Sequence, residues 1–294
     1  MTLDQLRAFV TVAQTRNMTR AAEQLNLSQP AVSAAIAALE ARYRTALFDR
    51  VHKGLELTQA GLVLLPRAQL VLQDVAVARQ ALTDLAGLLT GELRIFASQT
   101  VATYWLPPRI ATFAVTHRQL SIDLDVGNTS QAVAAVISGA ADLAFIEGDH
   151  HDAKLERVAI GGDELGFYAA AGHPLINKHL DRDDILGANW VLREPGSGTR
   201  DHFMATLGTY GVAPSDLDIL LELPSNGAVL EAARAGGLIA VTSCLAGRGR
   251  VDSGVLREIP CQLPPRAFFM LSNKDRAVSA AAKAFQGAIT SSAE

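Results

Sequence analysis

The spacing of hydrophobic residues divides the chain into three parts. In the first, apolar side chains recur at intervals of three and four in short stretches, which predicts several short amphipathic helices. From residue 58 to about residue 89 this spacing continues without a break and predicts one long helix. After Thr90-Gly91, short strand-like runs alternate with helical stretches, which is the pattern of βαβ units in an α/β fold.

Residues 17–43 predict two helices joined by a tight turn. Thr19 is a suitable N-cap for the first helix; Ser28 is suitable for the second, with Pro30 in its first turn. The side chains expected to face inward are Ala21, Ala22, Leu25, Val32, Ile36 and Leu39. A two-stranded tip with basic residues follows, and the long helix begins directly after it. This order of elements is typical of a helix-turn-helix with a wing, and it predicts DNA binding.

The second of these helices presents a face of small and amide-bearing side chains, namely Gln29, Pro30, Ser33, Ala34 and Ala37. A glutamine can pair with an adenine edge, a serine with several bases, and an alanine with a thymine methyl group. The basic residues suited to phosphate contacts are Arg42, Arg44, Arg50, His52 and Lys53. The alternative is an ordinary helical hairpin with a charged surface.

Charge supports a DNA-binding part at the N-terminal end. The 294 residues are 49% hydrophobic and 19% charged, which indicates a globular protein of two to three domains. The net charge is −4, but residues 1–60 carry seven Lys/Arg and five Asp/Glu, a net +2, and the remainder carries −6. Such a small positive charge predicts few phosphate contacts per subunit, so binding of DNA would need at least a dimer.

The long helix has a seam with heptad spacing. Its members are Leu65, Ala68, Leu72, Val75, Arg79, Leu82, Ala86 and Leu89, and all but Arg79 are apolar. Such a seam favours pairing with a second copy of the chain. The alternative is a helix packed on its own domain.

The α/β part contains two similar halves, each with alternating strands and helices. Strands are predicted at 93–98, 121–126 and 142–147 in the first half, at 164–170, 189–194, 219–223 and 238–243 in the second, and at 267–271 on return to the first, before a helix at 277–290. We expect parallel sheets, with crossings near 159–163 and 263–266 and a cleft between the halves. Ligands of such sheets bind at the carboxyl ends of the strands and at helix N-termini.

Two turns in matching positions are candidate anion sites. In the first half a strand runs into Ser98-Gln99-Thr100, and in the second a strand runs into 194–200, which holds Ser197, Gly198, Thr199 and Arg200. Hydroxyl groups, free backbone N–H groups and a helix dipole there favour a negative ligand. Glu147-Gly148 ends a strand on the same rim and can accept from a ligand or a neighbouring arginine. Each turn taken alone is also compatible with a simple helix cap.

Other chemistry has little support. His150-His151-Asp152 lacks the spacing of metal ligands, Ser197 lacks the spacing of a nucleophile elbow, and no phosphate loop or dinucleotide fingerprint is present. We therefore expect no enzyme, no metal and no cofactor beyond a small anionic effector ligand. Two alternatives stay open: a hydrolase that uses the Ser197–Arg200 turn, and a small-anion-binding protein without DNA activity.

No secretory signal, transit peptide or membrane span is visible, so we expect a cytoplasmic protein without a membrane partner. Cys244 and Cys261 are expected to be buried, reduced thiols.

Over essentially its full length the chain resembles the LysR-type transcriptional regulators. The resemblance is carried by 21–33 (AAEQLNLSQPAVS), 39–40 (LE), 47–50 (LFDR) and 57–61 (LTQAG). It implies a winged helix-turn-helix (1–58), a linker and dimerisation helix (59–90) and an effector-binding domain (91–294) of periplasmic-binding-protein type. The two subdomains of that last domain would comprise 91–160 with 267–294, and 163–264.

Within that family, Glu147-Gly148, 163–165 and 193–200 are similar to the branch that regulates carbon fixation and sulfur assimilation, whose members sense small anionic metabolites. The chain departs from the family at Ala34, Ala35 and Ala37, where polar or basic residues are usual. The DNA-contacting residues that follow are Thr19, Arg20, Ser28, Gln29, Pro30, Ser33, Ala34, Arg50 and Lys53. The effector-binding residues are Ser98, Thr100, Glu147, Arg193, Ser197, Gly198, Thr199 and Arg200.

The function expected from this resemblance is allosteric control of transcription. A homodimer, or a homotetramer built from two dimers, would hold double-stranded promoter DNA. A small anion (a sulfur oxyanion, or a phosphorylated or carboxylated compound) would close the two effector subdomains. The changed spacing between dimers would alter the DNA bend and the contact with RNA polymerase.

Overall fold

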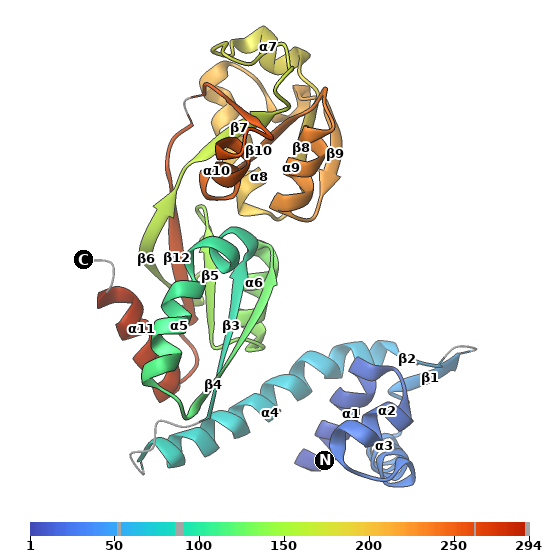
Figure 1. The fold of residues 1–294 in the computed structure, drawn as a ribbon. Helices are drawn as coiled ribbons and strands as arrows, with labels where there is room; N and C mark the ends of the chain where they lie inside the picture. Colours follow the sequence, from blue (N-terminus) through green and yellow to red (C-terminus); the bar gives the residue numbers. More distant parts are fainter. Residues whose placement is uncertain (52–53, 86–90, 262, 292–294) are drawn as a thin grey trace. The chain divides into compact units, whose positions relative to one another are not determined.

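The chain forms two compact units, which are described one at a time. The computed structural model describes residues 1–51, 54–85, 91–261 and 263–291 (Figure 1). The first unit is essentially Met1–Gly87, and the second consists of Leu88–Ile137 and Ala141–Glu294.

Three helices build the core of the first unit: α1 (Leu3–Thr15), α2 (Met18–Leu25) and α3 (Gln29–Tyr43). Ser28 caps α3 as predicted and accepts from the Ala31 N–H at 3.4 Å. The predicted cap Thr19 is wrong, because the side chain of Asn17 accepts from the N–H groups of Thr19 (2.9 Å) and Arg20 (3.1 Å) and starts α2 one residue later. The six side chains predicted to face inward all lie in this core, with Leu25 only partly buried.

The predicted two-stranded wing follows α3. Strands β1 (Phe48–Val51) and β2 (Gly54–Leu57) pair antiparallel. The Glu40 carboxylate of α3 accepts from the N–H groups of Leu47 (2.7 Å) and Phe48 (3.3 Å). This carboxylate therefore holds the start of the wing against the helix.

The long helix is α4 (Gln59–Leu85). Three members of the predicted seam, Leu65, Ala68 and Leu72, pack on the core of their own unit, where Ala68 is 1% exposed. The prediction that these three face a second copy is wrong, because the short helices α1 to α3 need them to complete a core. Ala86 and Leu89 lie outside the described residues. The exposed large apolar side chains of α4 are instead Leu62, Val63, Val71 and Leu82.

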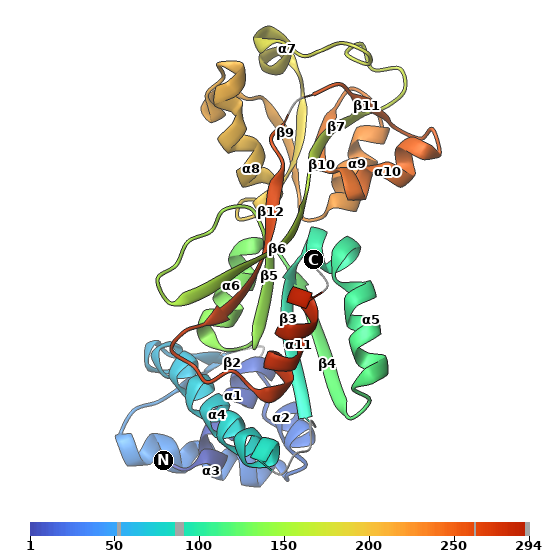
Figure 2. The ribbon, with the colours of Figure 1, turned by 90° about the vertical axis from the view of Figure 1, so that its left-hand side faces the viewer.

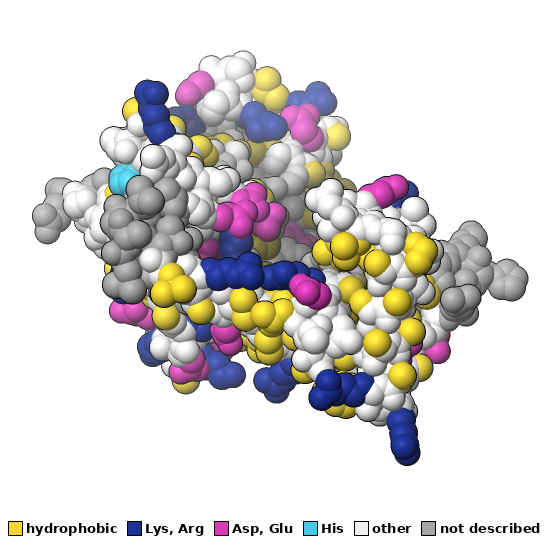
Figure 3. All heavy atoms as spheres, turned by 90° about the horizontal axis from the view of Figure 1, so that it is seen from below, with side chains coloured by type: hydrophobic (Ala, Val, Ile, Leu, Met, Phe, Trp, Pro, Cys, Tyr) yellow, Lys and Arg dark blue, Asp and Glu magenta, His cyan; other side chains and the backbone are white. Residues whose placement is uncertain are grey.

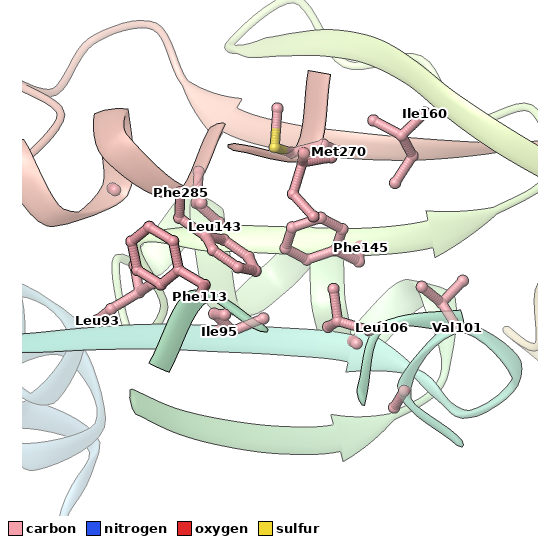
Figure 4. Close-up of a cluster of buried hydrophobic side chains, with 14 of the residues drawn as sticks. Leu93, Ile95, Val101, Leu106, Phe113, Leu143, Phe145, Ile160, Met270 and Phe285 are labelled. Carbon is pink, nitrogen blue, oxygen red and sulfur yellow. The ribbon is translucent and has the colours of Figure 1, made fainter. Parts of the chain in front are cut away.

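The first half of the second unit is a five-stranded sheet in the order β4-β3-β5-β12-β6. Its strands are β3 (Gly91–Ser98), β4 (Leu120–Gly127), β5 (Leu143–Glu147), β6 (Leu155–Asp163) and β12 (Arg266–Asn273). One face packs on the π-helical turn η1 (Val101–Trp105), α5 (Pro107–Thr116) and α11 (Ala280–Ser291), and the other face packs on α6 (Thr129–Ser138). Figure 4 shows the first of these cores, with Phe113, Phe285 and Phe145 over Leu93 and Ile95.

The second half repeats this plan in the order β11-β7-β10-β8-β9. Its strands are β7 (Leu165–Ala169), β8 (Trp190–Arg193), β9 (Ile219–Leu223), β10 (Ile239–Ser243) and β11 (Arg257–Ile259). Helices α7 (Arg182–Gly187) and α8 (Gly198–Thr206) lie on one face, continued by the 3-10 turns η2 (Leu207–Tyr210) and η3 (Pro214–Asp216). Helices α9 (Asn226–Arg234) and α10 (Cys244–Asp252) lie on the other.

The sheets are mixed and not parallel throughout, as predicted from the βαβ pattern. Strands β4, β3 and β5 are parallel, but β12 is antiparallel to both β5 and β6. The reason is that β6 and β12 carry the chain out to the second half and back, so they run in opposite directions (Figure 2). At the predicted crossings Asp163 of β6 lies opposite Arg266 of β12.

Two smaller expectations also meet the structure here. Cys244 and Cys261 are free thiols, but both are half-buried and not fully enclosed as predicted. Within the described ranges, no helix combines the length and hydrophobicity needed to cross a bilayer.

Candidate DNA-binding and effector sites

The predicted groove-facing side of α3 is open to solvent. Gln29, Pro30, Ala34 and Ala37 are exposed and Ser33 is half-buried, while Val32, Ile36 and Leu39 of the opposite side are buried. The Ser28 cap and the left-handed residue Asn26 (φ 52°) fix the start of this helix against α2. The surface therefore has the shape and chemistry that a recognition helix needs.

Thr19 and Arg20 lie beside it at the start of α2, with exposed side chains. The missed residue Asn17 holds their backbone N–H groups, and an asparagine two residues before Thr19 is the sequence signal that could have found it. Of the basic residues predicted on the wing, the side chain of Arg50 and the whole of Lys53 lie outside what the structure describes. Figure 3 shows hydrophobic side chains gathered over this unit, on the right of the view.

Most of the predicted effector residues come together between the two halves of the second unit. Ser98 and Glu147 end β3 and β5, and Thr199 lies in the first turn of α8. All are nearly inaccessible, as are the other members Thr100, Ser197 and Arg193. The carboxyl ends of parallel strands meet at one sheet edge, so residues far apart in sequence converge there.

The Glu147 carboxylate is the centre of this group. It accepts a hydrogen bond from the Ser98 hydroxyl and another from the Thr199 hydroxyl at 3.5 Å, and it lies 3.7 Å from Nη1 of Arg266. Burial raises the pKa of Glu147 above its ordinary value, although the positive charge of Arg266 acts in the opposite direction. The arrangement is two hydroxyl donors and one guanidinium around a single carboxylate.

Arg193 binds partners from both halves. Its guanidinium forms a bidentate ion pair with Glu194 (2.8 and 2.9 Å) and donates from Nη1 to Asn226 (2.9 Å) and Gln99 (3.2 Å). Burial acts to raise the pKa of Glu194, but hydrogen bonds and the charge of Arg193 hold it below its ordinary value. Most of the N–H groups of Arg193 are thus already engaged.

Two residues that sequence reasoning missed complete the site. Asn226, at the start of α9, donates from Nδ2 to the Thr100 hydroxyl at 3.1 Å, and its backbone N–H donates to Gln99 at 2.5 Å. Arg266 donates to Asp163 and also to the Thr199 hydroxyl at 3.1 Å. Neither lies in a motif, and only the predicted crossing at 263–266 came close to one of them.

Arg200 points elsewhere. Its Nη1 donates to the Arg193 carbonyl at 3.0 Å and forms an ion pair with Glu222 of β9. The structure therefore does not bring Arg200 together with Ser98, Thr100 and Thr199.

The turn before α8 has two features of a ligand site. The Ser197 hydroxyl is buried and has no hydrogen-bond partner among the described residues. A side chain at Gly198 would collide with the Glu147 carbonyl and the Thr129 hydroxyl, so only glycine allows this close approach. A cavity of about 150 Å³ opens beside Glu147 and Gly198, with Asp201 and His202 among its other walls.

No set of three or more His, Cys, Asp or Glu side chains within the described ranges could hold a metal ion. His151 of the predicted exposed loop pairs with Asp149 at 3.0 Å, and both are largely exposed.

Two family models match the chain. Residues 3–62 match the bacterial regulatory helix-turn-helix of the LysR family, and residues 86–294 match the LysR substrate binding domain.

Curated relatives agree. The chain is 34% identical to the HTH-type transcriptional regulator YeiE of Escherichia coli (strain K12), over 97% of this chain and 96% of that protein. It is 35% identical to the regulator CysL of Bacillus subtilis (83% and 81% of the chains) and 33% identical to CbbR of Rhodospirillum rubrum (82% and 79%).

Solved structures share the fold. CbnR in complex with its target DNA matches with a TM-score of 0.71 at 19% identity, over 99% of this chain and 98% of that chain. The regulatory domain of Synechocystis CcmR, in complex with 2-PG, matches with a TM-score of 0.63 at 21% identity, over 70% and 98%.

These relatives are transcriptional regulators and not enzymes, which removes the hydrolase alternative. Both family models together cover nearly the whole chain, in the order and at the positions of the two kinds of site described above. The chain belongs to the LysR family of transcriptional regulators.

Proposed function

We propose that this chain controls transcription in response to a small anion held between the two halves of its effector-binding unit. The observation that carries the proposal is the group around Glu147. Two hydroxyls and one guanidinium already hold a carboxylate there, and this is the donor set that a free oxyanion requires. An anion of similar size would take the place of this carboxylate.

Size and charge narrow the ligand class. The adjoining cavity of about 150 Å³ suits a compact ion such as a sulfur oxyanion, phosphate, or a short phosphorylated or carboxylated compound. The unpartnered Ser197 hydroxyl offers one further donor. Relatives named as regulators of cysteine or RuBisCO genes, and a fold neighbour solved with 2-PG, support this class.

We propose DNA contacts through the exposed side of α3, from Gln29, Pro30, Ser33 and Ala34, with Ser28 at its start. Thr19 and Arg20 of α2 and Arg50 and Lys53 of the wing would contact the backbone. The open, small-residue surface of α3 and the DNA complex of CbnR support this assignment.

We propose a homodimer through α4, with a changed seam. Leu62, Val63 and Val71 are 55%, 64% and 40% exposed, which is unusual for large apolar residues on one helix. Pairing with α4 of a second copy would bury them. Two dimers would then form a tetramer on an imperfect inverted repeat.

Coupling follows from the contacts between the halves. Asn226–Thr100 and Arg193–Gln99 exist only when the halves are closed, so an anion that adds donors and acceptors to this group favours the closed state. Closure would change the spacing of the dimers, the DNA bend and the contact with RNA polymerase. Reciprocally, DNA must change the affinity for the anion.

The test is a thermal-shift panel of sulfite, sulfate, phosphate, 2-phosphoglycolate and small carboxylates on the full chain. A ligand at about one hundred times its dissociation constant should stabilise by roughly 2.7 kcal/mol. Thr199→Ala should lose most of the response to the best anion, and Thr290→Ala, an exposed threonine of α11, should keep it. An unchanged response in Thr199→Ala would place the anion elsewhere.

A further inference from the structure

A second cavity lies on the outside of the first half, between α5 and α11. It measures about 370 Å³, which is within the range of small-molecule sites. Figure 1 and Figure 2 both show the two helices side by side, and Phe113 of α5 packs edge-on against Phe285 of α11 at 4.9 Å. No residue of the proposed effector site lines it.

The walls have two kinds of chemistry. Phe113, Phe285, Ala288 and Ile289 supply an apolar floor, and their rings are part of the core drawn in Figure 4. Arg109, Thr112, Thr116 and His117, all from one side of α5 and its end, supply polar groups. A body without charge and a polar head would each find a matching wall.

Arg109 is the informative side chain. It is half-buried, and no carboxylate of the described residues lies within 4.0 Å of it, whereas the half-buried Arg94, Arg157 and Arg200 each form an ion pair. Its Nη1 donates to the Trp105 carbonyl at 2.8 Å, which leaves other N–H groups of the fork free for a ligand. Burial without a partner lowers the pKa of Arg109, as expected for a cation that loses water and gains no anion.

We propose that this cavity binds a small monocarboxylic acid with an aromatic or branched apolar body. The Arg109 guanidinium holds the carboxylate, and Phe113, Phe285 and Ile289 hold the body. A carboxylate would give Arg109 the counter-ion that the protein itself does not supply.

The position of Arg109 connects this cavity to the proposed effector site. Its guanidinium stacks on the Trp105 ring at 3.7 Å. Trp105 ends the π-helical turn η1, which begins directly after Thr100, and π-helical turns are rare and frequent at functional sites. The Trp105 indole also lies against Gly161 of the crossing strand β6. An acid that moves Arg109 therefore acts on Trp105, and through it on Thr100 and β6.

Benzoate is a suitable probe, with benzamide as an uncharged molecule of the same shape. Trp105 and Trp190 are the only tryptophans, and Trp190 is enclosed in the other half. We expect benzoate to change the tryptophan fluorescence of the full chain in a saturable way and benzamide to bind about tenfold more weakly or less. Trp105→Phe should abolish the fluorescence change.

Variants identify the site. Arg109→Gln should weaken benzoate binding about tenfold or more, and Arg118→Gln, a nearby exposed arginine, should not. Ala288→Phe, which fills the cavity and keeps Arg109, should also block binding, with thermal unfolding as the check on folding. Absence of saturable benzoate binding, equal binding of benzamide, or full binding in Arg109→Gln would each overturn the proposal.

The link to the effector site rests on the proposed function, but the binding itself does not. Thr199→Ala should keep the benzoate response even if it loses the response to small oxyanions. A misplaced effector pocket would therefore leave the result for this cavity unchanged.

Discussion

Arg266 and Asp163 face each other across the two strands that connect the halves of the effector-binding unit. They form a bidentate ion pair of 2.6 and 3.0 Å, with side chains 1% and 2% exposed. The same guanidinium donates to Thr199 of α8, so one side chain joins both crossing strands to the proposed anion site.

This ion pair predicts a large cost for removing one partner. Asp163→Asn leaves the Arg266 charge buried without its counter-ion and should lower the free energy of unfolding by about 3 kcal/mol. Urea unfolding of the full chain measures it. The control Asp183→Asn affects a pair that is 3.8 Å apart and exposed, and should cost less than about 1 kcal/mol. Equal costs for both variants would contradict the structural role of the pair.

The raised pKa of Glu147 predicts proton-linked anion binding. A second anion beside a buried carboxylate is unfavourable, so binding should favour the protonated form of Glu147, near Asp163, Arg193 and Arg266. Affinity should therefore rise as the pH falls from neutral toward the ordinary glutamate value of about 4.3. Sulfate is the probe, since its charge is constant in this range, and calorimetry in two buffers counts the proton taken up.

Glu147→Gln keeps the shape of the neutral acid. It should bind sulfate with little dependence on pH, and Glu92→Gln, an exposed residue of β3, should behave as the unmodified chain. The same sign applies to folding: burial raises the Glu147 pKa, so its contribution to stability falls as the pH rises from the ordinary glutamate pKa through the raised one. A sulfate affinity that rises with pH would contradict this account.

The changed seam on α4 predicts which substitutions separate the copies. Val63→Glu places a charge on a 64% exposed apolar position and should shift the sedimentation equilibrium from dimer toward monomer without unfolding the chain. Ala68→Glu should instead lower the melting temperature strongly, because Ala68 is buried in its own unit. Leu27→Glu, also on an exposed apolar position, is the control that should leave the dimer intact.

The proposed division between base and phosphate contacts gives opposite signatures. Gln29→Ala should cost about 1–3 kcal/mol on the native promoter fragment and little on scrambled duplex. Arg20→Gln should weaken binding to both fragments and reduce the dependence on salt by about one charge. Fluorescence anisotropy at several salt concentrations distinguishes them, with Arg234→Gln in the effector-binding unit as the control. Equal losses on both fragments for Gln29→Ala would remove its role in base reading.

Local features of this protein were determined by its sequence. The cap at Ser28, the position of Pro30, the strands at 219–223 and 238–243 and the glycine turn before α8 agree with the structure closely. They depend on hydrogen bonds and backbone preferences within a few residues, and such effects are visible in a short window. The cap of α2 shows the limit of that window, because Asn17 and Thr19 are both suitable caps and only one can start the helix.

Tertiary structure decided which side chains share a site or a surface. Arg266 reaches Asp163, 103 residues away, and Asn226 reaches Thr100 across 126 residues, and no local pattern marks either pair. The heptad spacing of α4 was correct as a helix pattern, but the short helices of the first unit take up Leu65, Ala68 and Leu72. Periodicity determines that a face is apolar, whereas the partner of that face is set by the packing of the whole unit.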